Sequence, residues 1–262
     1  YTPFEWHQEL FQFAREKNIT LISTPFDESA VDLLESLDCP FYKVASFELT
    51  DLPLIKYIAE KKKPIILSTG MANETEISEA VNVVKSFGSG DFMLLHCVSG
   101  YPTPVDQINL NTIHLLKKTF NCDVGLSDHT LGNLSALQSI SLGAKVIEKH
   151  FTLSRKDKGP DSEFSMEPKE LKQLSKDIDL AFKSLGEASF KQKKSELPNM
   201  IFRRSIYVVK DLKKGAVLDK ESVRRIRPGY GLAPKYYNEI LGKKINKNIE
   251  KGTPLDWSLI DT

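Results

Sequence analysis

Short apolar runs alternate with amphipathic segments over the first 185 residues, and polar residues follow each run. Continuous apolar runs of this length are typical of strands that are buried on both faces of a parallel sheet. Their alternation with helices predicts an α/β fold, and the polar strand ends favour a (β/α)8 TIM barrel over an open sheet. Six runs have the length of a strand: 19–24, 41–46, 64–69, 92–98, 123–127 and 145–149.

The number of strands implies that part of the barrel is absent. A closed barrel of this class has eight strands, and the chain opens on an amphipathic helix, residues 4–17, with no strand before it. We therefore expect the first two βα units to be missing from this sequence. The remaining open barrel would expose apolar edges, which favours instability or aggregation.

The pattern changes after the last barrel helix, residues 169–185. Residues 186–200 have no apolar periodicity and are predicted to be a flexible linker. From residue 201 to residue 262 a short strand (RSIYVV) and the turn sequences KKG and KGTP indicate a small β-rich domain. The predicted organisation is thus a barrel domain over 1–185, a linker over 186–200 and a second domain over 201–262.

Composition excludes several classes of partner. The net charge is +1, so neither nucleic acid nor a membrane surface is favoured as a partner. No apolar run approaches the roughly 20 residues of a membrane span.

The three cysteines, Cys39, Cys97 and Cys122, are odd in number and widely spaced, which indicates reduced thiols and a cytoplasmic location. Cys97 beside His96 could be a nucleophile, although packing is the commoner role of such a residue.

Two histidines stand at the ends of neighbouring predicted strands. His129 ends one apolar run and His150 ends the next, and the helix between them would be capped by Asn133 and closed by Gly143. Neighbouring parallel strands lie about 5 Å apart, so the two imidazoles could share one metal ion. The alternative is two separate structural histidines. Their matched positions and the acidic neighbour Asp128 favour the metal site.

The other strand ends carry hydroxyl groups around one cation. Lys43 is that cation, and many neutral donors around one point charge suit a phosphate group. Two carboxylates, Glu48 and Asp161, and the phenol of Tyr101 complete the set. The residues alone therefore predict a metal-assisted reaction on a phosphorylated small molecule. The hydroxyls belong to Thr24, Ser46, Ser68, Thr69, Ser99 and Ser127.

Six motifs occur in an order that resembles the sialic acid synthase, or nonulosonic acid synthase (NeuB), family: KVASFE, ILSTGM, LLHCVSGYPTP, GLSDHT, EKHFTL and GPDSEFS. FRRSIYVVKDLKKG and RPGYGL resemble its C-terminal SAF domain, an antifreeze-like β-clip fold. The resemblance covers essentially the whole chain. It implies two further N-terminal βα units, which carry a Glu and a Lys of the active site. Residues 1–262 alone are accordingly expected to lack measurable synthase activity.

The resemblance implies a reaction in which phosphoenolpyruvate, an open-chain N-acetylated sugar and water give a nine-carbon 2-keto acid and phosphate. A divalent metal would polarise the sugar aldehyde. The enol carbon of phosphoenolpyruvate would attack that aldehyde, water would trap the resulting cationic centre, and the tetrahedral product would expel phosphate. The barrel would hold the two reactants in register.

By the same resemblance, His129 and His150 would hold Mn²⁺, with Mg²⁺ or Co²⁺ as alternatives. Glu48, Tyr101 and Asp161 would hold the sugar. With Lys43 and the two histidines, the carboxylates Glu48 and Asp161 form the predicted catalytic set. Phosphoenolpyruvate would be surrounded by Lys43, Thr24, Ser46, Ser68, Ser99 and Ser127, with Ser99 standing where relatives have Asn.

Two residues of the SAF domain are also implied in the site. Arg227 would reach the acetamido group of the sugar in a partner subunit, which implies a domain-swapped homodimer. Phe202 would enter the site as well. Solvated surface is the alternative role for Arg227, because it lies in the basic run RRIRPG.

The sugar is suggested by shorter stretches. FEWH, EKHFTLSR and RPGYGLAPKYY resemble the pseudaminic acid branch of the family, whereas HCVSGYPTP resembles the sialic and legionaminic acid branch. We expect pseudaminic acid, made from 2,4-diacetamido-2,4,6-trideoxy-altrose, with N-acetylneuraminate or legionaminate as alternatives. A non-catalytic truncated paralogue or SAF-type binding module, and a metal-dependent aldolase or another phosphoenolpyruvate-using barrel, are the rival interpretations. The SAF domain argues against the aldolase and against the other phosphoenolpyruvate-using barrel, because such enzymes lack it.

Overall fold

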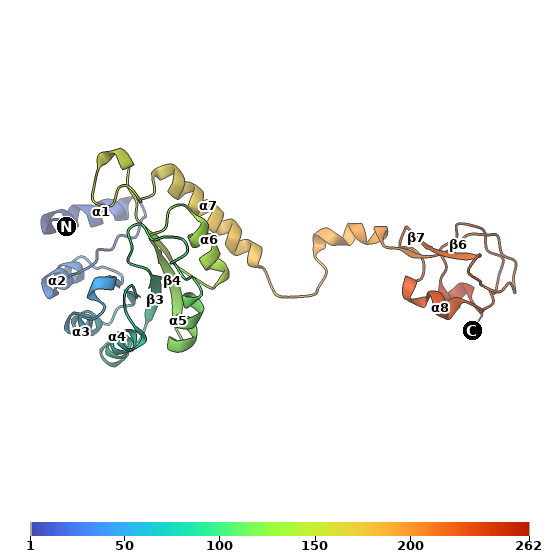
Figure 1. Cartoon of the computed structure of the whole chain (residues 1–262), viewed down its shortest axis with the longest axis horizontal. Coiled ribbons are helices and arrows are strands. Elements are labelled where there is room, and N and C mark those ends of the chain that lie inside the picture. The colour runs from blue at the N-terminus through green and yellow to red at the C-terminus, as the bar shows by residue number, and fades with distance from the viewer. Residues whose placement is uncertain (1, 262) are drawn as a thin grey trace. The chain divides into compact units, whose positions relative to one another are not determined.

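The computed structural model describes residues 2–261. The chain divides into two compact units, Tyr1–Gly186 and Glu187–Thr262 (Figure 1). Each unit has its own core of buried aliphatic side chains. Within residues 2–261, no helix is long and apolar enough to cross a membrane.

The first unit is built on a parallel sheet whose strands lie side by side in chain order (Figure 1). Cys97 pairs with Ser127 across β3 and β4, and Asp128 pairs with Lys149 across β4 and β5. This arrangement confirms the predicted parallel α/β fold, because successive parallel strands are joined by helical crossovers, as in a barrel. The strands are β1 (Tyr42–Val44), β2 (Ile65–Ser68), β3 (Phe92–Cys97), β4 (Asp123–Asp128) and β5 (Ile147–Lys149).

In the part of the first unit that the structure describes, seven α-helices accompany the sheet, and local signals explain where several of them begin. In α4 the Asn73 side chain accepts hydrogen bonds from the first turn while Glu76 bonds back to Asn73 N, a complete capping box. Asp27 caps α2 more simply, because its side chain accepts from Ala30 N without a reciprocal bond. Apolar helix faces and strands share one core, in which Ile55 and Leu67 are fully buried. The helices are α1 (Phe4–Glu16), α2 (Glu28–Ser36), α3 (Leu52–Glu60), α4 (Glu74–Phe87), α5 (Thr112–Phe120), α6 (Leu134–Ser141) and α7 (Pro168–Leu185).

The predicted strand over residues 19–24 is wrong. Within residues 2–261 this segment joins no strand of either sheet. Leu21 and Ile22 still pack against the core, and Ser23 Oγ lies 3.2 Å from His7 Nε2 of α1. Apolar character reports burial, whereas a strand also needs a hydrogen-bonded neighbour, and this segment has the first property without the second.

Helix α5 begins at Thr112, and the Ile108 carbonyl before it lies 2.6 Å from His96 Nε2. The predicted ends of α6 are confirmed only in part. Asn133 stands before α6, but its side chain makes no capping bond. Gly143, with φ of +94°, follows the helix end as expected, since glycine tolerates this conformation.

The second unit contains an antiparallel pair, β6 (Ser205–Val208) and β7 (Val223–Ile226). Ile206, Val223 and Leu255 are among its fully buried core residues, in keeping with the predicted small β-rich domain. The expectation of a flexible coil before it is partly wrong, because a 3-10 helix, η3, covers Lys194–Phe202. The remaining elements are η4 (Pro234–Tyr236), α8 (Tyr237–Ile240) and η5 (Trp257–Leu259), while η1 (Ser46–Glu48) and η2 (Arg155–Asp157) belong to the first unit.

Candidate active site

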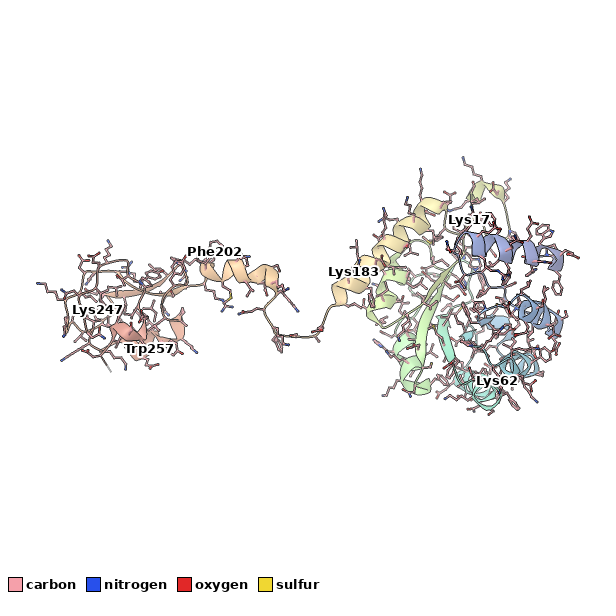
Figure 2. The ribbon with its side chains drawn as sticks, turned by 180° about the vertical axis from the view of Figure 1, so that it is seen from behind. Lys17, Lys62, Lys183, Phe202, Lys247 and Trp257 are labelled. Carbon is pink, nitrogen blue, oxygen red and sulfur yellow. The ribbon has the colours of Figure 1, made fainter. Side chains whose placement is uncertain are left out.

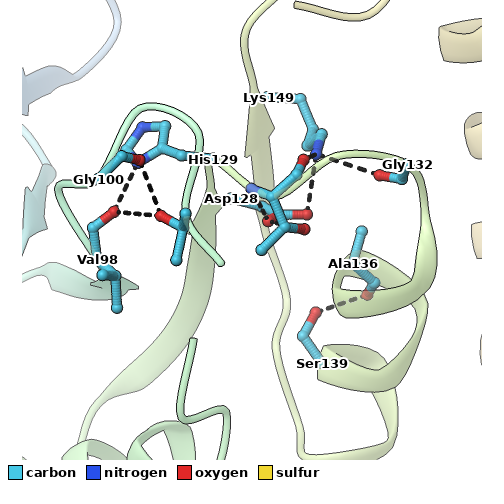
Figure 3. Close-up of polar contacts among 10 residues, drawn as sticks. Val98, Gly100, Asp128, His129, Gly132, Ala136, Ser139 and Lys149 are labelled. Atoms are coloured by element: carbon cyan, nitrogen blue, oxygen red, sulfur yellow. Dashed lines mark hydrogen bonds and ion pairs between the residues drawn. The ribbon is translucent and has the colours of Figure 1, made fainter. Parts of the chain in front are cut away.

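The two predicted histidine ligands lie together at the carboxyl ends of β4 and β5. The ring centroids of His129 and His150 are 5.2 Å apart. His129 Nδ1 lies 2.9 Å from the Val98 carbonyl oxygen (Figure 3). A carbonyl accepts, so Nδ1 carries the proton and the Nε2 lone pair is left for a ligand. His150 Nδ1 faces Asp161 Oδ2 at 3.4 Å, which leaves its Nε2 available in the same way.

This pair fits an open divalent metal site. Two neutral imidazoles are ordinary ligands of Mn²⁺ or a similar ion, and the remaining coordination positions can take oxygen from water or substrate. Among residues 2–261, no group of three His, Cys, Asp or Glu side chains could hold a metal ion. The donors present therefore suit an ion that shares its coordination sphere with substrate rather than a closed structural site.

The two imidazoles differ in their electrostatic surroundings. Burial opposes the charged form of His129, but the Cys97 thiol and the Val98 carbonyl outweigh burial and raise its pKa. Burial lowers the pKa of His150, and the neighbouring His129 lowers it further. His150 is consequently neutral at physiological pH, which is the form that binds a metal ion.

Aromatic rings cover one side of the histidine pair. The Tyr101 ring lies 4.4 Å from His129 and 5.9 Å from His150, measured between centroids. Phe164 lies 5.0 Å from His150 and 5.6 Å from Tyr101. Burial raises the pKa of Tyr101, so its phenol stays protonated and can donate a hydrogen bond. Phe164 was not predicted from the sequence.

Lys43 is itself buried and lies in a polar network that joins four strands, β1, β2, β4 and β5. Its ammonium donates to Ser68 Oγ at 2.7 Å and lies 3.6 Å from Glu148 Oε2. The other oxygen of Glu148 accepts from Ser127 Oγ at 2.6 Å. Burial lowers the pKa of Lys43, while the charge of Glu148 opposes that shift. Three residues of this network were predicted, and Glu148 was missed.

A second cluster of small polar groups lies near His129. Ser46 Oγ donates to Cys97 Sγ at 3.3 Å and accepts from Gly70 N at 3.1 Å. Cys97 Sγ is 3.9 Å from both Ser99 Oγ and His129 Nδ1. Burial alone would raise the pKa of Cys97, but its bonds to His129 and Ser46 lower it overall. Cys97 thus links two predicted phosphate-site serines to a predicted metal ligand.

Glycine at position 70 makes this cluster possible. A Cβ built there would overlap Ser99 Oγ and lie 2.7 Å from Ser46 Oγ. The two serine hydroxyls therefore occupy space that any side chain at position 70 would fill, and the backbone N–H of Gly70 donates to Ser46. Gly70 was not among the predicted site residues, although it follows the strand in the motif ILSTGM.

The predicted carboxylates occupy different environments. Glu48 Oε2 is buried without a hydrogen-bond partner among residues 2–261, and burial raises the pKa of Glu48. An orphaned buried oxygen of this kind suits a site that awaits a ligand. Asp161 lies against His150. Asp128, the acidic neighbour of His129, bonds to Lys149 at 3.1 Å on the other side of the strand.

Two of the predicted hydroxyls stand apart from the cluster. Thr69 Oγ1 donates to the Leu95 carbonyl at 3.0 Å and is occupied by the backbone. Thr24 lines a hollow beside His7 and Phe26, and that hollow shares no lining residue with the one that contains Lys43. The structure does not bring Thr24 into the Lys43 network.

The remaining two predicted residues belong to the second unit. Phe202 ends η3 and is 60% exposed (Figure 2). Arg227 directly follows β7 and is exposed. Both side chains are accessible to a partner, and their assignment to the site stays a prediction.

Comparisons with known proteins agree with the motifs. Residues 1–190 match the NeuB family, and residues 203–261 match the SAF domain. Pseudaminic acid synthase of Helicobacter pylori is 43% identical over 255 residues, which are 97% of this chain and 75% of that protein. N,N'-diacetyllegionaminic acid synthase of Campylobacter jejuni is 44% identical over 248 residues, covering 94% of this chain and 74% of the relative.

Solved structures show the same likeness. The spore coat polysaccharide biosynthesis protein spsE of Bacillus subtilis has a TM-score of 0.68 and 30% identity, covering 100% of this chain and 79% of the other. The N-acetylneuraminic acid synthetase of Leptospira borgpetersenii, in complex with citrate, has a TM-score of 0.72 and 34% identity, with coverage of 76% and 70%. The expected resemblance is confirmed: the chain belongs to the NeuB family of sialic acid synthase-type enzymes and carries a SAF domain.

Proposed function

We propose that this protein condenses phosphoenolpyruvate with an N-acetylated amino sugar and water, giving a nonulosonic acid and phosphate. One observation carries the proposal. The Lys43–Ser68–Glu148–Ser127 network spans β1, β2, β4 and β5, and its members Ser127 and Glu148 stand two residues before His129 and His150, whose rings are 5.2 Å apart. This proximity along β4 and β5 supports a site for a carbonyl oxygen beside a site for a phosphate.

Lys43 and the serines are the proposed phosphate ligands. The Lys43 ammonium supplies a positive charge that water screens little, because the side chain is buried. It already donates a hydrogen bond to the Ser68 hydroxyl. The hydroxyls of Ser46 and Ser99 add neutral donors, and Gly70 N holds the Ser46 oxygen in place. Such fixed donors stabilise a leaving phosphate without reorganising, because they are held in place before the substrate arrives.

Mn²⁺ is the proposed cofactor, with Mg²⁺ or Co²⁺ as alternatives, and when bound it would act as a Lewis acid toward the aldehyde oxygen. His129 and His150 would hold it through Nε2, and each Nδ1 is already engaged. Tyr101 and Phe164 exclude water from one side of the imidazoles. Exclusion of water strengthens every polar interaction formed there.

For the sugar we propose 2,4-diacetamido-2,4,6-trideoxy-altrose, with pseudaminic acid as product. The motifs FEWH, EKHFTLSR and RPGYGLAPKYY support this choice. The pseudaminic acid synthase relatives, at 41–43% identity, are as similar as the N,N'-diacetyllegionaminic acid synthase at 44%. Identity therefore does not separate the branches, and legionaminate or N-acetylneuraminate is the second candidate. Glu48, Tyr101 and Asp161 are the proposed sugar ligands.

We further propose a domain-swapped homodimer that works in the cytoplasm. Arg227 and Phe202 of one subunit would complete the site of the other, since a guanidinium is a good donor to an amide carbonyl. A two-fold axis would give both sites the same contribution. All three cysteines are free, which suits a reducing compartment.

The test of the function is product analysis. The protein tested is the full chain, meaning residues 1–262 together with the two N-terminal βα units that the resemblance implies. It is incubated with phosphoenolpyruvate, Mn²⁺ and each of the three candidate sugars in turn, and products are identified by mass and NMR. We expect pseudaminic acid and an equal amount of phosphate, and no product after chelation. If only another sugar gives product, that sugar is the substrate in place of the one proposed. Phosphate release without any nine-carbon acid would overturn the proposed reaction.

A further inference from the structure

Asp128 and Lys149 form an ion pair between the ends of β4 and β5, each one residue before a histidine. Lys149 Nζ lies 3.1 Å from Asp128 Oδ2, and the two side chains are only 4% and 0% exposed. The same two residues are partners in the parallel ladder. We propose that Asp128 and Lys149 are positioning residues, which fix the spacing and the direction of the imidazoles of His129 and His150.

Every donor of the Lys149 ammonium and both oxygens of the Asp128 carboxylate have a hydrogen-bond partner. The Lys149 ammonium donates to Asp128 Oδ2, to the Thr130 carbonyl at 2.7 Å and to the Gly132 carbonyl at 3.2 Å. Asp128 Oδ1 accepts from Thr130 N at 2.9 Å and from Thr130 Oγ1 at 2.8 Å (Figure 3). One network thus ties the end of β4, the loop after His129 and the end of β5.

Stability alone is a poor reason for such a pair. Removing two charges from water costs several kcal/mol per ion, and well-packed apolar residues often serve at least as well. A saturated ionic network differs from an apolar contact because it is satisfied in one register only. Neighbouring residues of a strand point to opposite faces, so the buried pair on one face places both imidazoles on the other. A slip of one residue would reverse one of them.

The two rings depend on this network to different degrees. Both histidine carbonyls accept a backbone bond, His129 from Thr103 N at 3.0 Å and His150 from Met166 N at 2.8 Å. Only the His129 ring is also bonded to a carbonyl, through Nδ1 to Val98. The His150 ring faces Asp161, whose side chain is 54% exposed. An exposed carboxylate restrains a ring weakly, so loss of the network should displace His150 more than His129.

The chain offers a matched control at the other end of the same strands. Lys145 and Asp123 form an ion pair of 2.8 Å with side chains 58% and 47% exposed. Lys149→Met and Lys145→Met remove the same group, in one case beside the histidines and in the other at the opposite end of β4 and β5. Asp128→Asn keeps the shape of the side chain but has only one acceptor oxygen, so it can accept from Lys149 or from Thr130 but not from both.

The first readout is the set of histidine ring ¹⁵N signals of the metal-free full chain. In wild type and Lys145→Met we expect His129 to show one tautomer, protonated at Nδ1. In Lys149→Met and Asp128→Asn, at a temperature where each is folded, the His150 signals should shift or broaden. Folded variants with wild-type ring signals would overturn the inference. If a single variant does not fold, the double variant Asp128→Asn/Lys149→Met removes both charges and is judged by the same signals.

The second readout, manganese affinity, rests on the proposed metal site. It should fall about 10- to 100-fold in Lys149→Met and Asp128→Asn and stay unchanged in Lys145→Met. Equal affinity in all folded variants would contradict the inference. A wild-type protein without manganese affinity would contradict the proposed cofactor, and the ring signals of the metal-free protein would still decide the role of Asp128 and Lys149.

Discussion

Glu148 is shared between Lys43 and Ser127. One carboxylate oxygen accepts the Ser127 hydroxyl at 2.6 Å, and the other lies 3.6 Å from the Lys43 ammonium. The carboxylate therefore stands beside the cation that we assign to the phosphate of phosphoenolpyruvate. Lys43 is the centre of this network, and its replacement should affect one substrate more than the other.

Lys43→Ala should raise the KM for phosphoenolpyruvate far more than the KM for the sugar. Hydrogen bonds to charged groups contribute about 1.5–3 kcal/mol, which corresponds to a roughly 10- to 150-fold rise. Initial rates with each substrate varied in turn measure both constants. Lys56→Ala, at an exposed lysine of α3, is the control and should change neither. An equal effect of Lys43→Ala on both constants would show that Lys43 is not a phosphate ligand.

The affinity for phosphoenolpyruvate should weaken at alkaline pH. Burial lowers the pKa of Lys43, so the ammonium loses its proton below the ordinary lysine value of about 10.4. As pH rises through the lowered pKa, the phosphate loses its positive partner and the KM for phosphoenolpyruvate rises. Lys43→Arg stays charged, and its alkaline limb should disappear. A wild-type KM that is constant up to the ordinary lysine value would count against this assignment.

Gly70→Ala should impair phosphoenolpyruvate binding while the protein remains folded. The added methyl would displace the Ser46 and Ser99 hydroxyls, and such overpacking costs about 1–3 kcal/mol. Gly100→Ala is the matched control, because its Cβ would meet no atom nearer than 3.5 Å. Calorimetric titration with phosphoenolpyruvate compares the two. Wild-type affinity in Gly70→Ala would place the phosphate elsewhere.

Arg227 should act on the site of a partner subunit. Full chains carrying His129→Ala are mixed with full chains carrying Arg227→Ala, and each variant alone should be inactive. In a swapped heterodimer one site carries both lesions and the other carries neither, so activity should return on mixing. If subunit exchange is demonstrated by mass and activity stays absent, Arg227 acts within its own chain or has no role in the reaction.

The sequence predicts the sheet better than its hydrogen bonding. Apolar runs located all five strands, because a strand buried on both faces has no polar alternation to obscure it. The same property misassigned residues 19–24, where Leu21 and Ile22 are partly buried without a strand partner. Asn133 failed as a cap because helix ends are also set by neighbouring loops, which a local pattern does not contain.

The candidate site was predictable where strand periodicity applies. Glu148 stands two residues before His150, as Ser127 stands two before His129, so each pair shares a face of its strand. That spacing could have identified Glu148. Phe164 lies in a loop without periodicity, and its approach to His150 depends on how that loop folds.

Joint metal binding by the two histidines is tested most directly by manganese content. Wild type, His129→Ala and His150→Ala are each loaded with Mn²⁺ and desalted, and the metal content and the activity of each are then measured. His114→Ala, at an exposed histidine of α5, is the control. Two imidazoles 5.2 Å apart should hold one ion jointly, so each single variant should lose both metal and activity while the control keeps both. Wild-type manganese content in His129→Ala and His150→Ala would contradict the account.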